Sequence, residues 1–170
     1  MPKFHIASLI GQPQGTIERY TFDESIELPD ISEFKLSTSV TGKVQFIKLP
    51  HEINVQITDL ATVAETICSR CLEPISLPIK VKEISREFII DLPQEDLQEG
   101  EEVFYIDKGR REIVLDEMVR EEILLHFPPI PLCSGGCKGL CDQCGANLNQ
   151  VTCTCEHMDM SENHPFRLPL

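Results

Sequence analysis

Polar and apolar residues alternate along much of the first 90 positions, a pattern typical of β-strands with one buried face. The alternation is regular in EINVQITD (52–59) and imperfect in TIERYTF (16–22). In ISLPIKVKEISREFIIDL (75–92) it shifts phase after Val81, and Pro78 indicates a sheet edge or a strand entry. These segments predict β-strands that expose one face to solvent.

Two further segments extend the predicted sheet. LSTSVTGKVQFIKL (36–49) predicts one long or bent strand pair, with a bulge or sharp turn at Gly42. ATVAETIC (61–68) predicts another strand, which ends at Cys68. We therefore expect four to six antiparallel strands in one sheet, which could curl toward a barrel.

The period changes from two to about 3.6 in LDEMVREEILLHFP (115–128), which predicts one main helix over about 115–127. Asp116 is the expected N-cap and Pro128 ends the helix. An apolar stripe at helical spacing predicts core packing and comprises Leu115, Met118, Val119, Ile123 and Phe127. The fold class is therefore α+β, a β-rich domain over 1–130 that carries the helix.

The chain that joins the sheet to this helix is polar and acidic. PQEDLQEGEE (93–102) predicts a mobile loop, VFYI (103–106) a short strand and DKGR (107–110) a turn. A Cys-rich segment over 131–157 and a tail over 158–170 complete the expected organisation.

Charge and length exclude several function classes. The net charge is −13, and residues 83–126 carry fourteen acids against five bases. Bulk electrostatics therefore do not draw the chain to nucleic acid, and an RNA contact must be local or go through a partner. No run approaches the ~20 apolar residues that span a bilayer, and no secretory signal opens the chain. We expect a cytoplasmic protein with reduced thiols and without a membrane partner.

The eight cysteines carry the clearest chemical signal, because they come in four pairs. Zinc binds four thiolates tetrahedrally, and a Cys-x-x-Cys turn can offer two of them to one ion. Eight thiols in four pairs therefore predict two structural Zn²⁺ sites, whose ligands are Cys68, Cys71, Cys133, Cys137, Cys141, Cys144, Cys153 and Cys155.

Spacing alone leaves the division of these pairs open. We favour Cys141 and Cys144 with Cys153 and Cys155 in a small zinc-ribbon-like cluster, which leaves Cys68 and Cys71 to join Cys133 and Cys137. This second group would clamp the end of the helix to the sheet across a long stretch of chain. The rival division joins Cys133 and Cys137 to Cys141 and Cys144.

An enzymatic reading is weaker. A redox Cys-x-x-Cys needs its first cysteine at a helix N-terminus, whereas Pro74 and β-alternation follow Cys71. A catalytic zinc keeps an open position, and eight sulfurs fill both sites. His126 and His157 could each replace one ligand, but we expect His126 to be a residue at the helix end and His157 to be a residue of the tail. Neither a nucleophilic triad nor a phosphate loop is present in the sequence, so we predict no catalytic residue and no small-molecule substrate.

Three ordered motifs resemble the YceD family of large ribosomal RNA subunit accumulation proteins. They are CSRCLEPISLPI, LDEMVREEILLHFPPIPLC, and CKGLCDQCGANLN closed by CTC, and the resemblance covers roughly residues 10–157. Beyond the eight cysteines, the matching positions are Arg70, Leu72, Glu121, Leu124, Pro128, Pro131, Gly139, Leu140, Gly145, Asn147, Leu148 and Asn149. The chain departs from the family in its tail, where Arg167 is the only base of ENHPFRLPL.

The resemblance implies a non-enzymatic role in the synthesis, processing or stability of 23S rRNA and in large ribosomal subunit biogenesis. The expected partner is large-subunit rRNA or its precursor particles, with Arg70 and Lys138, one in each Cys-pair turn region, as candidate partner-binding residues. The alternative is an acidic adaptor or chaperone for a basic ribosomal protein. A CxxC thiol oxidoreductase is the third hypothesis.

Overall fold

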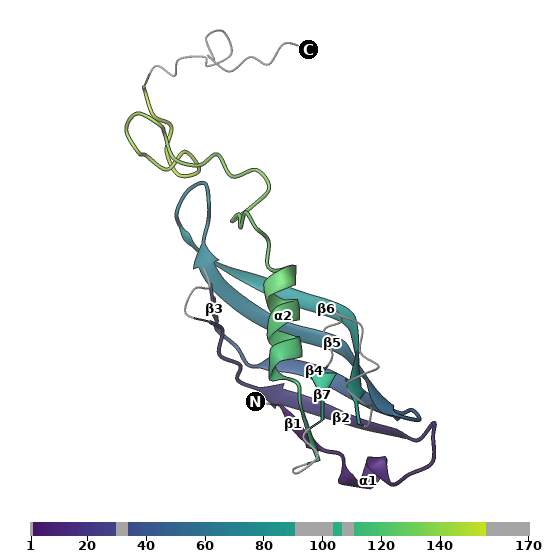
Figure 1. Ribbon diagram of the computed structural model, residues 1–170. Helices are drawn as coiled ribbons and strands as arrows, with labels where there is room; N and C mark the ends of the chain where they lie inside the picture. Colours follow the sequence, from purple (N-terminus) through teal and green to yellow (C-terminus); the bar gives the residue numbers. More distant parts are fainter. Residues whose placement is uncertain (1, 30–33, 91–103, 107–110, 156–170) are drawn as a thin grey trace, which may run out of the picture. The chain divides into compact units, whose positions relative to one another are not determined.

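The computed structural model describes residues 2–29, 34–90, 104–106 and 111–155 (Figure 1). The chain forms two compact units. Unit 1 comprises Met1–Thr66 and Ser76–Pro129, and unit 2 comprises Ile67–Ile75 and Ile130–Leu170. The turn that links two long strands therefore belongs to unit 2, together with the Cys-rich segment.

Unit 1 is built on one large sheet whose strand order is β2-β4-β5-β6-β7, with β3 also paired to β5 (Figure 1). The neighbours are antiparallel where their register is given, except for β6 and β7, which are parallel. The strands are β2 (Ile17–Glu24), β3 (Lys35–Leu36), β4 (Val40–Lys48), β5 (Glu52–Ile67), β6 (Pro74–Ile89) and β7 (Phe104–Tyr105).

The α+β class and the mostly antiparallel sheet are confirmed, but the expectation of a barrel-like sheet was wrong. Among the described residues, the path ends at β2 on one side and at β7 on the other, so the sheet is open. Closure requires the two end strands to pair along their length. Here β7 contributes two residues, paired only with the end of β6.

The strand β5 runs through a region where two strands were expected. Its buried apolar positions are Ile53, Val55 and Ile57 before Asp59, and Leu60 and Ala64 after it. Asp59 has a φ of 55°, and the register between β4 and β5 shifts at this point. A β-bulge therefore absorbs the phase change, and the strand continues with its apolar side chains on the same face.

The sequence predicted a bulge or sharp turn at Gly42 itself, whereas the extra residue lies on β5 and Gly42 lies opposite it on β4. It pairs with Phe22 on β2, and a Cβ at Gly42 would lie 2.8 Å from the Phe22 Cζ atom. The glycine therefore makes room for an aromatic ring at the bend of the sheet.

The phase shift after Val81 is also present in β6, where Ile79 and Val81 are buried and the next buried residue is Ile84. Pro78 lies in the part of β6 that has no β7 partner among the described residues, because β7 pairs only with Phe88 and Ile89. Proline has no backbone N–H to donate, but at this position no hydrogen bond to β7 is lost.

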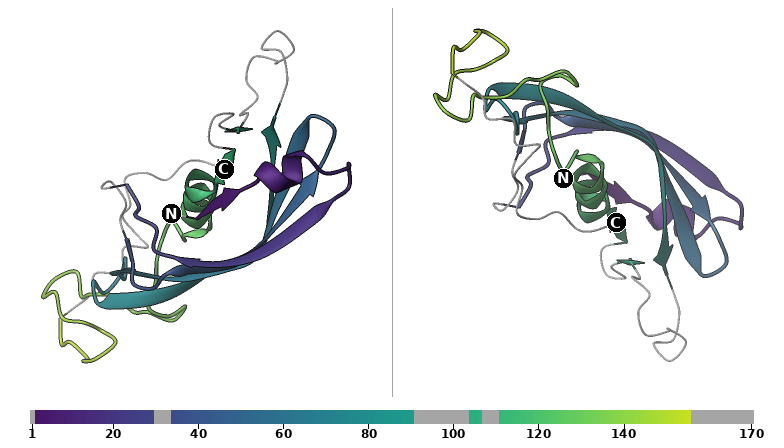
Figure 2. Two further views of the ribbon diagram at one scale, coloured as in Figure 1. Left: turned by 90° about the horizontal axis from the view of Figure 1, so that it is seen from below. Right: turned by 90° about the horizontal axis from the view of Figure 1, so that it is seen from above.

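One face of the sheet is covered by α2 (Asp116–His126), which lies across the curved strands (Figure 2). Met118, Val119 and Ile123 are fully buried in the same core as the inward side chains of the sheet. A short helix, α1 (Ala7–Ile10), and a two-stranded sheet of β1 (Lys3–His5) and β8 (Glu112–Val114) complete this core. The apolar stripe of the predicted helix is thus core packing.

The start of α2 differs from the prediction. Leu115 is the N-cap, and Asp116 is the first helical residue, nearly buried and paired with Arg120 one turn later. Asp116 still places a negative charge at the positive end of the helix dipole. The predicted loop at 93–102, the turn at 107–110 and the tail at 158–170 lie outside the described residues.

Candidate metal centres

Four cysteines from two distant segments of unit 2 come together in what we call the first centre, formed by Cys68, Cys71, Cys133 and Cys137. Their sulfur atoms all lie within 4.8 Å of one another. The Cys68 and Cys137 Sγ atoms are 3.8 Å apart, and those of Cys71 and Cys133 are 3.7 Å apart. Three of the four side chains are buried.

These sulfur–sulfur distances match four ligands around one tetrahedrally coordinated ion better than a disulfide bond. A disulfide needs an S–S distance of about 2.05 Å. Four sulfurs at about 2.3 Å from one central ion lie about 3.8 Å from each other when the angles are tetrahedral. The residues of the first centre therefore fit a metal ion bound by four thiolates.

The local backbone explains how Cys68 and Cys71 reach the same point. The Leu72 N–H donates to the Cys68 carbonyl at 2.9 Å, and the Cys68 N–H donates to the Glu73 carbonyl at 2.8 Å. Leu72 closes this turn with a φ of 58°, in the left-handed region. The tight turn places both sulfurs on its inner side.

The second centre comprises Cys141, Cys144, Cys153 and Cys155, with sulfur atoms again within 4.8 Å of one another. Its turn repeats the backbone pattern of the first. The Gly145 N–H donates to the Cys141 carbonyl at 2.9 Å, and the Cys141 N–H donates to the Ala146 carbonyl at 2.8 Å. Gly145 has a φ of 71° and thus occupies the position that Leu72 has in the first turn.

The grouping is the one that the sequence favoured, with the rival division not formed. The zinc-ribbon-like architecture stays a prediction. Within the described part of the Cys-rich segment, the only β-pairing is a single bridge between Leu140 and Asn147.

The thiols differ in acidity within each turn. Backbone hydrogen bonding from Cys71, and also from Arg70, lowers the pKa of Cys68 to about 6. In the second centre, backbone hydrogen bonding from Cys144 and then Gln143 lowers the pKa of Cys141 to about 7. The first cysteine of each turn is therefore prepared as a thiolate, the form that binds metal.

In the second centre, a neighbouring thiolate opposes the ionisation of Cys155. The side chain of Cys144, followed by burial, raises the pKa of Cys155 to about 12. A dication between the four sulfurs would remove this repulsion. The electrostatics of each centre thus favour a bound cation over four free thiolates.

Arg70 and Lys138, the candidate partner-binding residues, are both exposed. The Arg70 guanidinium donates to the Cys137 carbonyl at 3.0 Å, so this side chain also braces the first centre. The Lys138 backbone N–H donates to the Asn149 side-chain oxygen at 2.8 Å. His126 lies on α2, where its Nδ1 is 2.9 Å from the Glu122 carbonyl oxygen, and His157 lies outside the described residues.

Four polar side chains around the centres were not assigned a role from the sequence. The Asn149 amide donates to the Cys137 sulfur at 3.3 Å. Glu73 accepts from Asn147 and Gln150, each at 3.2 Å. The two asparagines lie in GANLN, directly after a Cys-x-x-Cys turn, and a side-chain amide close to a cysteine cluster was the available signal.

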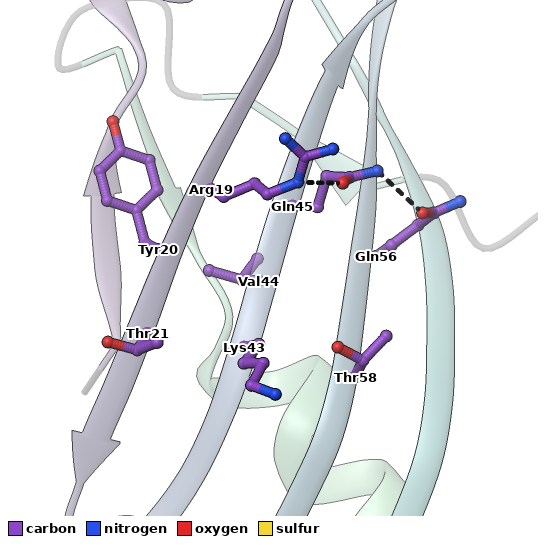
Figure 3. A pocket seen from close by; sticks show the side chains of 8 residues that line it. All are labelled: Arg19, Tyr20, Thr21, Lys43, Val44, Gln45, Gln56 and Thr58. Atoms are coloured by element: carbon purple, nitrogen blue, oxygen red, sulfur yellow. Dashed lines mark hydrogen bonds between the residues drawn. The ribbon is translucent and has the colours of Figure 1, made fainter.

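A separate hollow of about 640 Å³ lies on the polar face of the large sheet (Figure 3). The Arg19 guanidinium donates to Gln45 at 2.8 Å, and Gln45 donates to Gln56 at 3.2 Å. The lining mixes polar and apolar groups and contains neither a thiol nor a carboxylate, so it offers no metal centre. It consists of Arg19, Tyr20, Thr21, Lys43, Val44, Gln45, Gln56 and Thr58.

The fold and the site define a class: an α+β protein with an open, mostly antiparallel sheet and two four-cysteine clusters that can hold metal ions. The chain belongs to the YceD family. The family model, described as large ribosomal RNA subunit accumulation protein YceD, matches residues 58–167, which include all eight cysteines. The resemblance seen in the sequence motifs is therefore confirmed.

Two curated relatives carry the same description. The Arabidopsis thaliana large ribosomal RNA subunit accumulation protein YCED homolog 1, chloroplastic, is 26% identical over 150 residues, which cover 74% of this chain and 46% of the relative. The homologue of that name from Zea mays is 36% identical over 58 residues, or 34% of this chain and 20% of the relative. The chain thus spans less than half the length of the relatives it matches.

No solved structure matches the chain. None of the helices that the structure describes combines the length and the apolar character needed to cross a bilayer.

Proposed function

We propose that this protein is a non-enzymatic, zinc-stabilised factor that supports the synthesis, processing or stability of 23S rRNA and thereby large ribosomal subunit biogenesis. The observation that carries the proposal is membership of the YceD family over residues 58–167. The two relatives named for accumulation of large ribosomal subunit RNA support it. A cytoplasmic location accompanies this proposal.

The metal would be held by all eight cysteines, two ions in two centres. Tetrahedral sets of four sulfurs suit zinc or iron, and zinc brings no redox chemistry to a site that serves only to hold the fold. When bound, each ion would fix two chain segments against each other and neutralise the thiolates. Metal analysis of the purified protein tests this part, with about two zinc ions per chain expected and an iron spectrum or no metal contradicting it.

The non-enzymatic role rests on coordination number. A catalytic zinc has three protein ligands and leaves the fourth position to water or substrate. Each centre here supplies four sulfurs at mutual distances suited to one ion, so no position is left for a reactant. The metal then acts through the surface that it holds in shape.

That surface includes Arg70 and Lys138, which we propose as contacts to rRNA phosphate. Because the Arg70 guanidinium also binds the Cys137 carbonyl, Arg70→Glu would disturb the first centre as well as the contact. Lys138→Glu is the cleaner test, since the Lys138 side chain makes no hydrogen bond or ion pair with the residues that the structure describes, and only its backbone N–H is engaged. We expect Lys138→Glu to keep its metal and to lower mature large-subunit rRNA.

The experiment that tests the whole proposal is depletion of the protein in cells, followed by complementation. Wild-type protein should restore the ratio of large- to small-subunit rRNA, and a Cys68→Ser/Cys71→Ser variant should not. An unchanged rRNA ratio on depletion would refute the role in rRNA accumulation.

Sedimentation of the tagged protein identifies the partner. Migration with large-subunit precursors that nuclease treatment abolishes supports an rRNA contact. The net charge of −13 favours a second candidate, an adaptor for a basic ribosomal protein. A nuclease-resistant, salt-sensitive complex with one such protein would establish that alternative.

A further inference from the structure

One side chain of the second centre's loop reaches a sulfur atom of the first centre. Asn149 lies between Cys144 and Cys153, on the loop of the second centre, yet its side-chain N–H donates to the Cys137 sulfur of the first centre at 3.3 Å. The loop is therefore part of the ligand environment of both centres.

The orientation of the Asn149 amide is fixed by its other partners. Its oxygen accepts the Lys138 backbone N–H at 2.8 Å, and a backbone N–H can only donate. The amide nitrogen must therefore face Cys137, and it also donates to the Asn147 side-chain oxygen at 2.9 Å. The donor to sulfur is set by the network around it.

The loop itself is held at both ends. Its ends are the two cysteine pairs of the second centre, and its middle lies against the segment that contains Cys137. The Leu148 N–H donates to the Gly139 carbonyl at 2.9 Å, and the Asn147 amide donates to Glu73 at 3.2 Å. When its end cysteines are no longer tied together, the loop loses the constraint that presents Asn149 to the sulfur.

We propose that Asn149 couples the two centres, so that loading the second centre with metal raises the affinity of the first. This inference rests on the zinc binding of the proposed function and adds to it an order of assembly. A hydrogen bond to a coordinating thiolate holds the sulfur in place and disperses its charge. Asn149 is a positioning residue, because it touches a ligand and not the ion.

The coupling has a measurable size. Loss of a hydrogen-bond partner behind a metal ligand lowers metal affinity by about ten- to a hundredfold. We expect Asn149→Ala to lower the zinc affinity of the first centre by this factor. Cys153→Ser/Cys155→Ser, which dismantles the second centre, should lower it comparably without touching any ligand of the first.

A double-mutant cycle in the full chain tests the proposal. Zinc affinity of the first centre is measured by competition with a chelator in the wild type, in Asn149→Ala, in Cys153→Ser/Cys155→Ser and in the triple variant. If Asn149 carries the coupling, the triple variant is no weaker than either parent. Effects that add would overturn the proposal, because the second centre would then act by another route.

A control and a spectroscopic readout separate coupling from misfolding. Gln150→Ala removes a contact to Glu73 from the same loop but no contact to sulfur, and it should leave the first-centre affinity within about threefold of wild type. In cobalt-substituted protein, Asn149→Ala should shift the sulfur-to-metal charge-transfer band to lower energy, since an unbonded thiolate is a better electron donor. An unshifted band would overturn the proposal.

The outcomes for the two proposals differ. Wild-type protein that binds no metal would refute the zinc-binding proposal and this inference with it. Wild-type protein that binds two ions, with first-centre affinity indifferent to Asn149→Ala, would refute the coupling alone.

Discussion

The two Cys-x-x-Cys turns have the same backbone hydrogen bonds, but one closes with Leu72 and the other with Gly145. Both residues have a φ in the left-handed region, 58° for Leu72 and 71° for Gly145. Exchanging the residue types should therefore change the metal affinities of the two centres in opposite directions. We take Leu72→Gly and Gly145→Ala as the matched pair.

The magnitude follows from two opposing terms. A side chain with a Cβ in the left-handed region costs about 1.5 kcal/mol. A glycine adds about 0.7 kcal/mol of freedom to the unfolded chain, which favours unfolding. Nothing lies within 4 Å of a Cβ at Gly145, and Leu72 is 57% exposed, so contacts add little to either change. The net effect is about 0.8 kcal/mol in each case.

Because folding of such a site is coupled to metal binding, this difference appears in metal affinity. Gly145→Ala should weaken zinc binding at the second centre by about fourfold, and Leu72→Gly should strengthen it at the first centre by about fourfold. Competition with a chelator measures both. Gly136→Ala is the control, since Gly136 has no positive φ and no neighbour within 4 Å of its Cβ. Without backbone strain it should weaken neither centre, and the lost freedom of the unfolded chain alone should strengthen the first centre by about threefold.

A weaker first centre in Leu72→Gly would refute this reasoning. It would mean that the Leu72 side chain holds the turn by packing that outweighs its backbone strain. Equal losses from Gly145→Ala and Gly136→Ala would refute the assignment of the effect to backbone conformation.

Three further predictions concern the rest of the chain. Arg86→Ala should lower the unfolding free energy of unit 1 by about 2 kcal/mol in chemical denaturation, because it removes the partner at 2.9 Å from the largely buried Glu122 carboxylate and leaves it the more distant His126 Nδ1 at 3.6 Å; Arg86→Ala/Glu122→Leu should recover much of the loss. Gly42→Ala should cost about 1–2 kcal/mol in the same assay, since its Cβ would lie 2.8 Å from the Phe22 ring, and Phe22→Leu should relieve the clash. Metal removal by a chelator should abolish hydrogen-exchange protection at unit 2 amides such as those of residues 68 and 140, while unit 1 amides in β5 stay protected. Equal loss of protection in both units would contradict their independence.

The sequence predicted most elements of the sheet, because period-two alternation is a local property of each strand. It failed at Asp59, where a bulge and a strand end leave the same trace, a change of phase in the apolar positions. It also failed to exclude a barrel, since closure depends on whether β2 and β7 meet, and no local pattern encodes that.

The candidate site was more predictable than the sheet, for a chemical reason. Cysteine pairs at short spacing have few uses in a chain with reduced thiols, so eight candidate ligands could be inferred from spacing. Spacing favoured their grouping but left the rival division open, and the structure brings together the favoured groups. The hydrogen bonds around the ligands could not be inferred from the sequence. The contact between Asn149 and Cys137 depends on side-chain geometry that no spacing rule describes.

The two centres differ in how much the fold depends on them. Cys71 and Cys133 are 62 residues apart, and a cross-link over that separation removes about 4 kcal/mol of chain entropy from the unfolded state. The second centre joins Cys144 to Cys153 over a far shorter loop, and the same relation gives about 2.6 kcal/mol. The first centre therefore supplies the larger stabilisation, while the second is local and can form early. On the coupling proposed for Asn149, metal binding at the second centre closes the short loop first and positions the Cys137 sulfur. The long loop between Cys71 and Cys133 then closes at a smaller entropic cost, and the turn between β5 and β6 is the last segment to be held by metal.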